Sequence, residues 1–498
     1  MVGVKIFYNF VSGMKTLIKS YKIMKKHLLF FIVAHLIIGL QTNAFAQMQG
    51  IINNSSEKVS RAISPEANTV KVKKYADSIM ITLCRNTNSS RYCFAQTKLG
   101  SNTVEYAELP SEFKIYDFTI YKDEIYFCGN FNNQLYNVGF IAWANFNDLF
   151  NGGVFHYDRM QITKIVYELE VFYNNALGTM NIVALGSDDE HGNSATGTYF
   201  CIDYKLNSNT YDLYPTQNYI LHTLTQTPTS VDVIFSENNT HARMFGVMRH
   251  MKNNMSNCQS LIWQYSYNGF DYTSGDARPQ KRRPCFLAEN IDDSELICVT
   301  TAIQSELTYS VITNHKINTF VIDVSSLQLL YTQVIPTVGK PILKDMKYNK
   351  RNKILNILAN TSLDSIFNGC THPVYGPLGC IDAIYELRPL ITPSASSYSS
   401  LVIVPEDNIF LEVLNGIEIY DDRYYIVAGK SANTGTLYWF DRRYSTQNIC
   451  YDRYTFNAHF EPTNPVGNMN YGYITHPKDV YTNTFIPYST IYNTICLD

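Results

Sequence analysis

One pattern of hydrophobic and polar positions recurs about seven times along the chain. A strand-like run ends in Tyr and a polar turn, an apolar run follows, and a second apolar run comes after a polar loop of variable length. Tyr121-Lys122-Asp123-Glu124 leads into Ile125–Cys128, and Tyr420-Asp421-Asp422-Arg423 leads into Tyr424–Ala428. Polar turn residues between apolar β runs predict hairpins, so the chain is expected to be a repeat of β-hairpins.

The other predicted hairpins align with these two, and their spacing is longer than the roughly 40–50 residues of a four-stranded propeller blade. The excess length is assigned to loops. Two turns also match each other over six positions, Lys98–Thr103 and Lys205–Thr210. The remaining hairpin turns are predicted at Tyr75–Asp77, Tyr173–Asn175, Ser236–Thr240, Glu289–Asp293 and Tyr348–Lys350.

Strands of this kind cannot bury both faces alone, whereas radial stacking of small sheets buries both. We therefore predict an all-β fold, a β-propeller of about seven four-stranded blades with a short C-terminal tail. A β-helix would need shorter periods, and a β-sandwich would not explain the recurrence. The predicted divisions are 1–46 (N-terminal extension and signal peptide), 47–68 (flexible lead-in), 69–455 (propeller) and 456–498 (tail).

Across residues 69–455 the repeats resemble those of bacterial secreted β-propellers in general. The Gly-His and Trp-Asp signature of WD40 repeats is absent. Tyr438-Trp439-Phe440-Asp441 is similar to the YWTD type, but it occurs once and has Phe where that family has Thr. The resemblance implies the fold and a secreted setting, and it points to no characterised family or ligand.

The N-terminus reads as an export signal. Met24-Lys25-Lys26 supplies the charged start, Leu28–Leu40 is apolar, and Ala44-Phe45-Ala46 has the small-x-small cleavage pattern, so the mature chain is predicted to begin at Gln47. A membrane anchor is the alternative, but the run is shorter than the roughly 20 residues of a spanning helix. We expect an exported protein of the periplasm, cell surface or medium, with no transmembrane span in the mature chain.

Charge and cysteine content refine this expectation. The net charge of −3 and the lack of an extended basic run give no electrostatic basis for a nucleic-acid partner. Export makes the 11 Cys candidates for disulfides, and the odd number leaves at least one thiol or an intermolecular partner. Buried free thiols are the alternative for Cys128 and Cys201. Proximity in the sequence suggests the pairs Cys84 and Cys93, Cys285 and Cys298, and Cys370 and Cys380, and a bond between Cys450 and Cys496 could tie down the tail. The sequence does not fix the connectivity.

The loops between the second and third strands of propeller blades emerge on one face, and loop variation on one face often marks the binding side of a repeat protein. Tyr136, His250, His372 and Tyr375 are candidates for polar recognition there, with ordinary solvated loops as the alternative. The predicted loops of this face are 130–137, 187–197, 249–258 and 361–378.

An acidic loop is the candidate cation site. Asp188, Asp189 and Glu190 offer oxygen ligands of the kind that Ca²⁺ prefers, although their spacing does not match an EF-hand. A solvated acidic loop is the alternative, and we expect no other cofactor.

No catalytic residue is assigned from the sequence, because acidic residues predicted on innermost strands fall at different distances from their hairpin turns. These residues are Asp117, Glu168, Asp232, Asp345 and Glu418. The leading hypothesis is an exported, non-catalytic β-propeller that binds a protein or glycan partner through one loop-rich face. The alternatives are a carbohydrate-active enzyme, a glycosidase or lyase using channel carboxylates, and a structural scaffold of the envelope.

Overall fold

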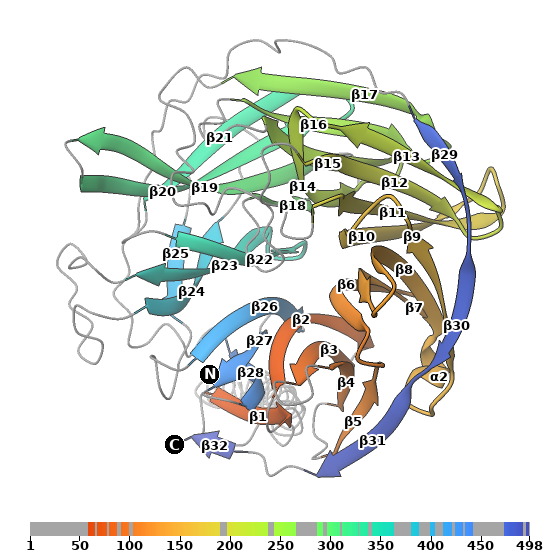
Figure 1. Ribbon diagram of the computed structural model, residues 1–498. Coiled ribbons are helices and arrows are strands. Elements are labelled where there is room, and N and C mark those ends of the chain that lie inside the picture. The colour runs from red at the N-terminus through yellow and green to blue at the C-terminus, as the bar shows by residue number, and fades with distance from the viewer. Residues whose placement is uncertain are drawn as a thin grey trace, which may run out of the picture. The chain divides into compact units, whose positions relative to one another are not determined.

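The chain folds as an all-β propeller, which confirms the predicted fold class (Figure 1). Within the described residues, four five-stranded and three four-stranded antiparallel sheets are present, with one short helix, α2 (Phe146–Leu149). The computed structural model describes residues 58–491 and 495–497, apart from the internal segments 65–66, 77–78, 87–90, 99–102, 190–196, 238–243, 265–285, 292–295, 309–310, 327, 337–340, 363–379, 388–398, 404–411, 421–423, 432–433 and 442–472.

Each sheet is built from strands that follow one another along the chain, and we number the sheets in chain order. Sheet 1 contains β2 (Ala67–Ala76), β3 (Ile79–Asn86), β4 (Tyr92–Lys98) and β5 (Thr103–Glu108). Sheet 2 contains β6 (Phe113–Tyr121), β7 (Glu124–Asn132), β8 (Asn137–Asn145) and β9 (Val154–Met160). Sheet 3 contains β10 (Ile165–Asn174), β11 (Thr179–Ser187), β12 (Tyr199–Lys205) and β13 (Thr210–Thr216).

The remaining sheets follow the same order. Sheet 4 contains β14 (Tyr219–Gln226), β15 (Ser230–Glu237), β16 (Met244–Met251) and β17 (Asn254–Gln264). Sheet 5 contains β18 (Phe286–Asn290), β19 (Leu296–Thr308), β20 (Val311–Asp323) and β21 (Gln328–Pro336). Sheet 6 contains β22 (Pro341–Asn349), β23 (Ile354–Ser362), β24 (Cys380–Leu387) and β25 (Ser399–Ile403). Sheet 7 contains β26 (Glu412–Tyr420), β27 (Tyr424–Ser431) and β28 (Thr434–Asp441).

The first strands of successive sheets contact one another in chain order, from β2 through β6, β10, β14, β18 and β22 to β26, and β26 contacts β2 again. These strands are therefore the innermost ones. The fourth strand of sheet 7 comes from the other end of the chain, because β1 (Lys58–Ser64) pairs with β28. The segment 47–68, predicted as a flexible lead-in, thus supplies a strand that joins the two ends of the described chain.

The C-terminal strands add a further strand to four of the sheets (Figure 1). They are β29 (Ile474–Pro477) on sheet 3, β30 (Val480–Thr484) on sheet 2, β31 (Ile486–Ile491) on sheet 1 and β32 (Ile495–Leu497) beside β1. An unpaired outer strand exposes a row of N–H and C=O groups that invites association. The tail occupies these edges in sheets 1, 2, 3 and 7.

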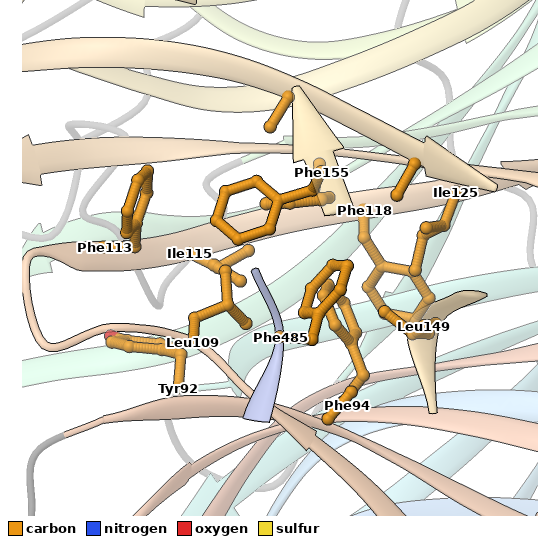
Figure 2. Close-up of a cluster of buried hydrophobic side chains, with 14 of the residues drawn as sticks. Tyr92, Phe94, Leu109, Phe113, Ile115, Phe118, Ile125, Leu149, Phe155 and Phe485 are labelled. Atoms are coloured by element: carbon orange, nitrogen blue, oxygen red, sulfur yellow. The ribbon is translucent and has the colours of Figure 1, made fainter. Parts of the chain in front are cut away.

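The core consists of apolar layers between neighbouring sheets. In β7 every residue except the two terminal ones is buried, because sheet 2 packs on both of its faces. Figure 2 shows the layer between sheets 1 and 2, where the ring centroids of Phe94 and Phe118 lie 5.4 Å apart in an edge-to-face contact. Phe485 of the tail enters the same layer, 4.8 Å from the ring of Phe155. Burial of one such side chain is worth about 1.5–3 kcal/mol.

One predicted hairpin is wrong by one strand. Ser236–Thr240 is expected from the sequence to separate the first two strands of a repeat. In the structure Ser236 lies in β15, and this part of the chain leads from β15 to β16, the second and third strands of sheet 4. The turn between the first two strands, β14 and β15, lies at residues 227–229. β14 contains buried Thr and His side chains, so it lacks the apolar pattern by which the sequence marks a strand. The predicted loop 249–258 consequently covers the end of β16 and the start of β17.

Candidate functional site

Six of the innermost strands carry a β-bulge at an equivalent place. A bulge interrupts the ladder, so nearby backbone groups need other hydrogen-bond partners. The residue that follows the bulge points toward the neighbouring first strands in several sheets and is polar or charged in most. In chain order these residues are Lys71, Asp117, Glu168, Thr223, Asp345 and Gly416.

Asp117 shows what the carboxylates do. Its Oδ1 accepts a hydrogen bond from the backbone N–H of Phe118 at 2.8 Å, and its Oδ2 accepts one from the backbone N–H of Leu169 at 3.0 Å. The first group belongs to its own strand and the second to the first strand of the next sheet. One buried side chain therefore links two innermost strands.

Asp345 repeats this arrangement between sheets 6 and 7. It accepts from the N–H of Met346 at 2.9 Å and of Ile417 at 3.0 Å. We call such a carboxylate, which bonds its own strand and the next, an inter-sheet clasp.

Two glutamates make related bonds. Oε1 of Glu168 accepts from the N–H of Leu224 at 2.8 Å and from the Thr223 hydroxyl at 2.6 Å, both in sheet 4. Glu418 accepts from Ile419 N–H at 3.0 Å and from Lys74 N–H at 3.2 Å, and so links sheet 7 to sheet 1. Hydrogen bonds to an ionised acceptor are worth about 1.5–3 kcal/mol.

Lysines lie among these acids. Lys71 forms an ion pair with Asp117, and the Nζ of Lys347 lies 3.6 Å from Oε1 of Glu289. Burial lowers the pKa of Lys71, but Asp117, Glu168 and Asp345 together raise it above its ordinary value. The carboxylates of Glu418 and Glu289 raise the pKa of Lys347. We define the axial cluster as these groups of the innermost strands: Lys71, Asp117, Glu168, Glu289, Asp345, Lys347 and Glu418.

Two acids of the axial cluster titrate near neutral pH. Burial raises the pKa of Glu168 to about 7, against an opposing effect of Lys71. Burial likewise raises the pKa of Glu289 to about 7, against an opposing effect of Lys347. Burial also raises the pKa of Asp345. A raised carboxyl pKa beside ionised carboxylates is a pattern that acid–base catalysts use, and it also arises in structural charge networks.

The acidic residues do lie at different distances from their hairpin turns, yet three of them share one structural position. Asp117, Glu168 and Asp345 each follow a bulge, and the length of strand between bulge and turn differs among the sheets. Asp232 lies on β15, a second strand, where its Oδ2 accepts from the Ser230 hydroxyl at 3.0 Å. Sequence reasoning missed Lys71, Glu289 and Lys347, and alignment on the apolar residue after each bulge would have found Lys71.

Tyr136, the first loop candidate, lies in the connection between β7 and β8 and is 46% exposed. The Arg159 guanidinium lies over its ring at 4.4 Å and over the ring of Tyr481 at 3.9 Å. Arg159 also contacts Asp479 of the tail at 3.3 Å. The neighbouring Leu135 is 82% exposed. An exposed aromatic and apolar pair held beside a fixed cation is suited to recognising a partner.

His250 lies elsewhere and is wholly buried on β16. Its Nδ1 lies 2.9 Å from the carbonyl oxygen of Met255, and its Nε2 lies 3.0 Å from Sδ of Met248. Burial lowers the pKa of His250 to about 4. The structure therefore does not bring His250 together with Tyr136 on an exposed loop. The other two candidates, His372 and Tyr375, lie outside the described residues.

The acidic loop is described only in part, since Glu190 is outside the described residues. Oδ1 of Asp188 accepts from the backbone N–H of Thr198 at 2.8 Å, and the N–H of Asp189 donates to the Ser187 hydroxyl at 3.1 Å. Among the residues that the structure describes, no group of three or more His, Cys, Asp or Glu side chains is arranged to hold a metal ion.

The described cysteines are all in the thiol form: Cys84, Cys93, Cys128, Cys201, Cys258 and Cys298. Cys84 and Cys93 are buried and stand directly opposite each other on β3 and β4, as the predicted pairing requires. Burial raises the pKa of the Cys84 thiol, and the hydrogen bond with Cys93 raises it further. Cys285, Cys370 and Cys450 lie outside the described residues, and Cys380 and Cys496 lie in β24 and β32 with their side chains undescribed.

Comparison with known proteins identifies no family for this chain. No family model matches the chain, and no curated protein matches it. Among solved structures, the polysaccharide lyase Uly1 is similar at 9% identity and a TM-score of 0.38, over 76% of this chain and 91% of that one. Drosophila Plexin A, solved in complex with Semaphorin 1b, is similar at 8% identity and a TM-score of 0.37, over 77% and 88%. No helix among the described residues has the length and apolar character needed to cross a membrane.

Proposed function

We propose that the chain is an exported, non-catalytic propeller of seven blades, one per sheet, that binds a protein or glycan through the face bearing the connections between second and third strands. The observation that carries this proposal is the use of the axial carboxylates. Asp117 and Asp345 each place both oxygens on backbone N–H groups of two sheets. Carboxylates engaged in this way connect the first strands of neighbouring sheets, which favours a structural role for them over a catalytic one.

The binding surface that we favour lies at one end of sheet 2. Leu135 and Tyr136 are in the β7–β8 connection, and Ile162, 36% exposed, is in the β9–β10 connection. The two connections adjoin, because Gly139 N–H donates to the carbonyl of Thr163 at 2.7 Å. Aromatic rings with a polar tip contribute contact area and a hydrogen bond at little entropic cost, which favours them in protein and glycan recognition.

A carbohydrate-active enzyme is the second candidate, and the pKa values favour it. Glu168 and Glu289 each have a pKa of about 7, so each carries a proton in a large fraction of molecules at neutral pH. A protonated carboxyl near an ionised one is what glycosidic cleavage requires. Glu168 already accepts two hydrogen bonds on Oε1, which favours the structural interpretation for that residue.

A glycan array probed with the chain from Gln47 onward, with and without Ca²⁺, tests binding and the cation hypothesis together. We expect specific binding that Tyr136→Ala weakens at least tenfold. Tyr173→Ala is the matched control, because Tyr173 is 42% exposed at the opposite, β10–β11 end of a sheet. Loss of binding without Ca²⁺ would assign a role to Asp188, Asp189 and Glu190.

Hydrolysis products on bound glycans would contradict the non-catalytic proposal. Their absence from Glu168→Gln or Glu289→Gln protein would then assign the chemistry to the axial cluster. A blank array, followed by capture of an envelope protein that Tyr136→Ala abolishes, would retain the binding proposal with a protein partner. A blank array with no such partner would favour a scaffold.

A further inference from the structure

Two sulfur atoms lie beside one buried imidazole in sheet 4. Met248 and His250 are two residues apart on β16 and so share a face of the strand. Cys258 of β17 stands directly opposite His250. The Nε2 of His250 lies 3.0 Å from Sδ of Met248 and 3.9 Å from Sγ of Cys258.

The other ring nitrogen determines the tautomer. Nδ1 lies 2.9 Å from the carbonyl oxygen of Met255, and a carbonyl can only accept, so Nδ1 carries the proton. The ring is buried among apolar groups and the Tyr214 ring, 5.0 Å away, which disfavours a second proton. Nε2 therefore presents a lone pair.

This lone pair faces a second acceptor. A thioether sulfur has no proton to donate, so Nε2 and Met248 Sδ meet at 3.0 Å with no hydrogen between them. The thiol of Cys258, at 3.9 Å, is a long contact for a weak donor. Electron pairs directed at one another in a buried site repel, and a cation between them would turn that repulsion into bonding.

We propose that Met248, His250 and Cys258 form a binding site for the soft cation Cu(I). Thioether and thiolate sulfur select Cu(I), imidazole suits copper, and no carboxylate is in the set. The Nδ1–H bond to a backbone carbonyl is the support that metal-ligating histidines commonly have.

The geometry needs little adjustment. Ligand lengths of about 2.0 Å to nitrogen and about 2.3 Å to sulfur place N and S atoms roughly 3.6–3.8 Å apart at trigonal or tetrahedral angles. Cys258 Sγ, at 3.9 Å from Nε2, is close to this separation. Met248 must retreat by roughly 0.7 Å, which its flexible side chain allows. Cys258 is the partly exposed member of the set and marks the route of entry.

Anaerobic titration of the full chain with Cu(I), against a chromophoric Cu(I) chelator, tests the site. We expect one Cu(I) per chain from this site, with affinity reduced at least about tenfold by Met248→Leu and by Cys258→Ser. Met346→Leu and Cys298→Ser alter a buried methionine and a buried cysteine elsewhere and serve as controls. Copper-edge X-ray absorption should show one nitrogen and two sulfur neighbours, and one sulfur fewer in Met248→Leu.

The Leu variant conserves volume, so it should fold, and its unfolding curve checks this. Full affinity in folded Met248→Leu would overturn the three-donor site. Equal losses in the control variants would also overturn it, as would displacement of the metal by an equal concentration of Zn²⁺.

Discussion

Replacement of Glu168 by Gln should make the protein more stable at alkaline pH and leave it nearly unchanged at acidic pH. Burial raises the pKa of Glu168 from its ordinary value of 4.5 to about 7. The folded protein therefore holds this proton more tightly than the unfolded chain between those values. The free energy of unfolding consequently falls as the pH rises across that window, and the loss is complete above it.

The size of the effect follows from the same values. About 7 minus 4.5 is about 2.5 pKa units, and at about 1.36 kcal/mol per unit this gives roughly 3 kcal/mol. Gln preserves the hydrogen bonds, because Thr223 and Leu224 both donate to the single oxygen Oε1. The variant thus removes the titration and keeps both hydrogen bonds to sheet 4.

Urea unfolding of both proteins at pH 5 and pH 8 measures this difference. The advantage of Glu168→Gln in unfolding free energy should grow by roughly 2.5 kcal/mol between the two pH values, because a small part of the effect is already present at pH 5. Glu105→Gln, at an exposed strand position, is the control and should show no such growth. An advantage that is the same at both pH values would refute the argument that burial of the axial cluster sets this pKa.

Three further predictions concern the framework. A Cβ at Gly129 would lie 1.8 Å from the carbonyl oxygen of Lys114, so Gly129→Ala should cost at least about 3 kcal/mol, and a near-native melting temperature would contradict this. Truncation before Tyr473 removes the strands that cover the outer edges of four sheets, and the exposed edges should associate as the protein concentration rises. Light scattering measures this, and a truncated chain that stays monomeric would show that the tail is not needed to protect the edges. Mild oxidation should join Cys84 to Cys93, because directly opposed strand residues have the Cα separation of a disulfide. Mass spectrometry should show a loss of about 2 Da, and the same loss in Cys93→Ser would exclude this pair.

The clasps explain how a repeat fold without a shared signature holds its sheets in order. The apolar layers between sheets are non-directional, whereas a carboxylate that bonds N–H groups of two strands fixes their relative position. Asp117 does this between sheets 2 and 3, and Asp345 between sheets 6 and 7. A charge placed there must also be balanced, which accounts for Lys71 beside Asp117.

The sequence by itself determined the fold class. Runs such as Ile125–Cys128 are rich in residues that favour strands, and polar turn residues bound them. These local preferences predict a strand and a hairpin without knowledge of the rest of the fold. The recurrence of those runs then predicted the propeller, because sheets buried on both faces need neighbours of the same kind. The matched turns Lys98–Thr103 and Lys205–Thr210 fall at corresponding places, between the third and fourth strands of sheets 1 and 3.

Only the tertiary structure decided which polar residues meet. Asp117 and Asp345 share a register that depends on bulges, and a bulge is a property of strand pairing with no reliable local signal. His250 is expected on an exposed loop from the sequence, because the predicted hairpin of sheet 4 is one strand too late. In the structure it lies within β16, between β15 and β17, and is buried. The pairing of β1 with β28 and the tail on the outer edges join segments hundreds of residues apart, and long-range contacts of this kind are set by packing of the whole chain.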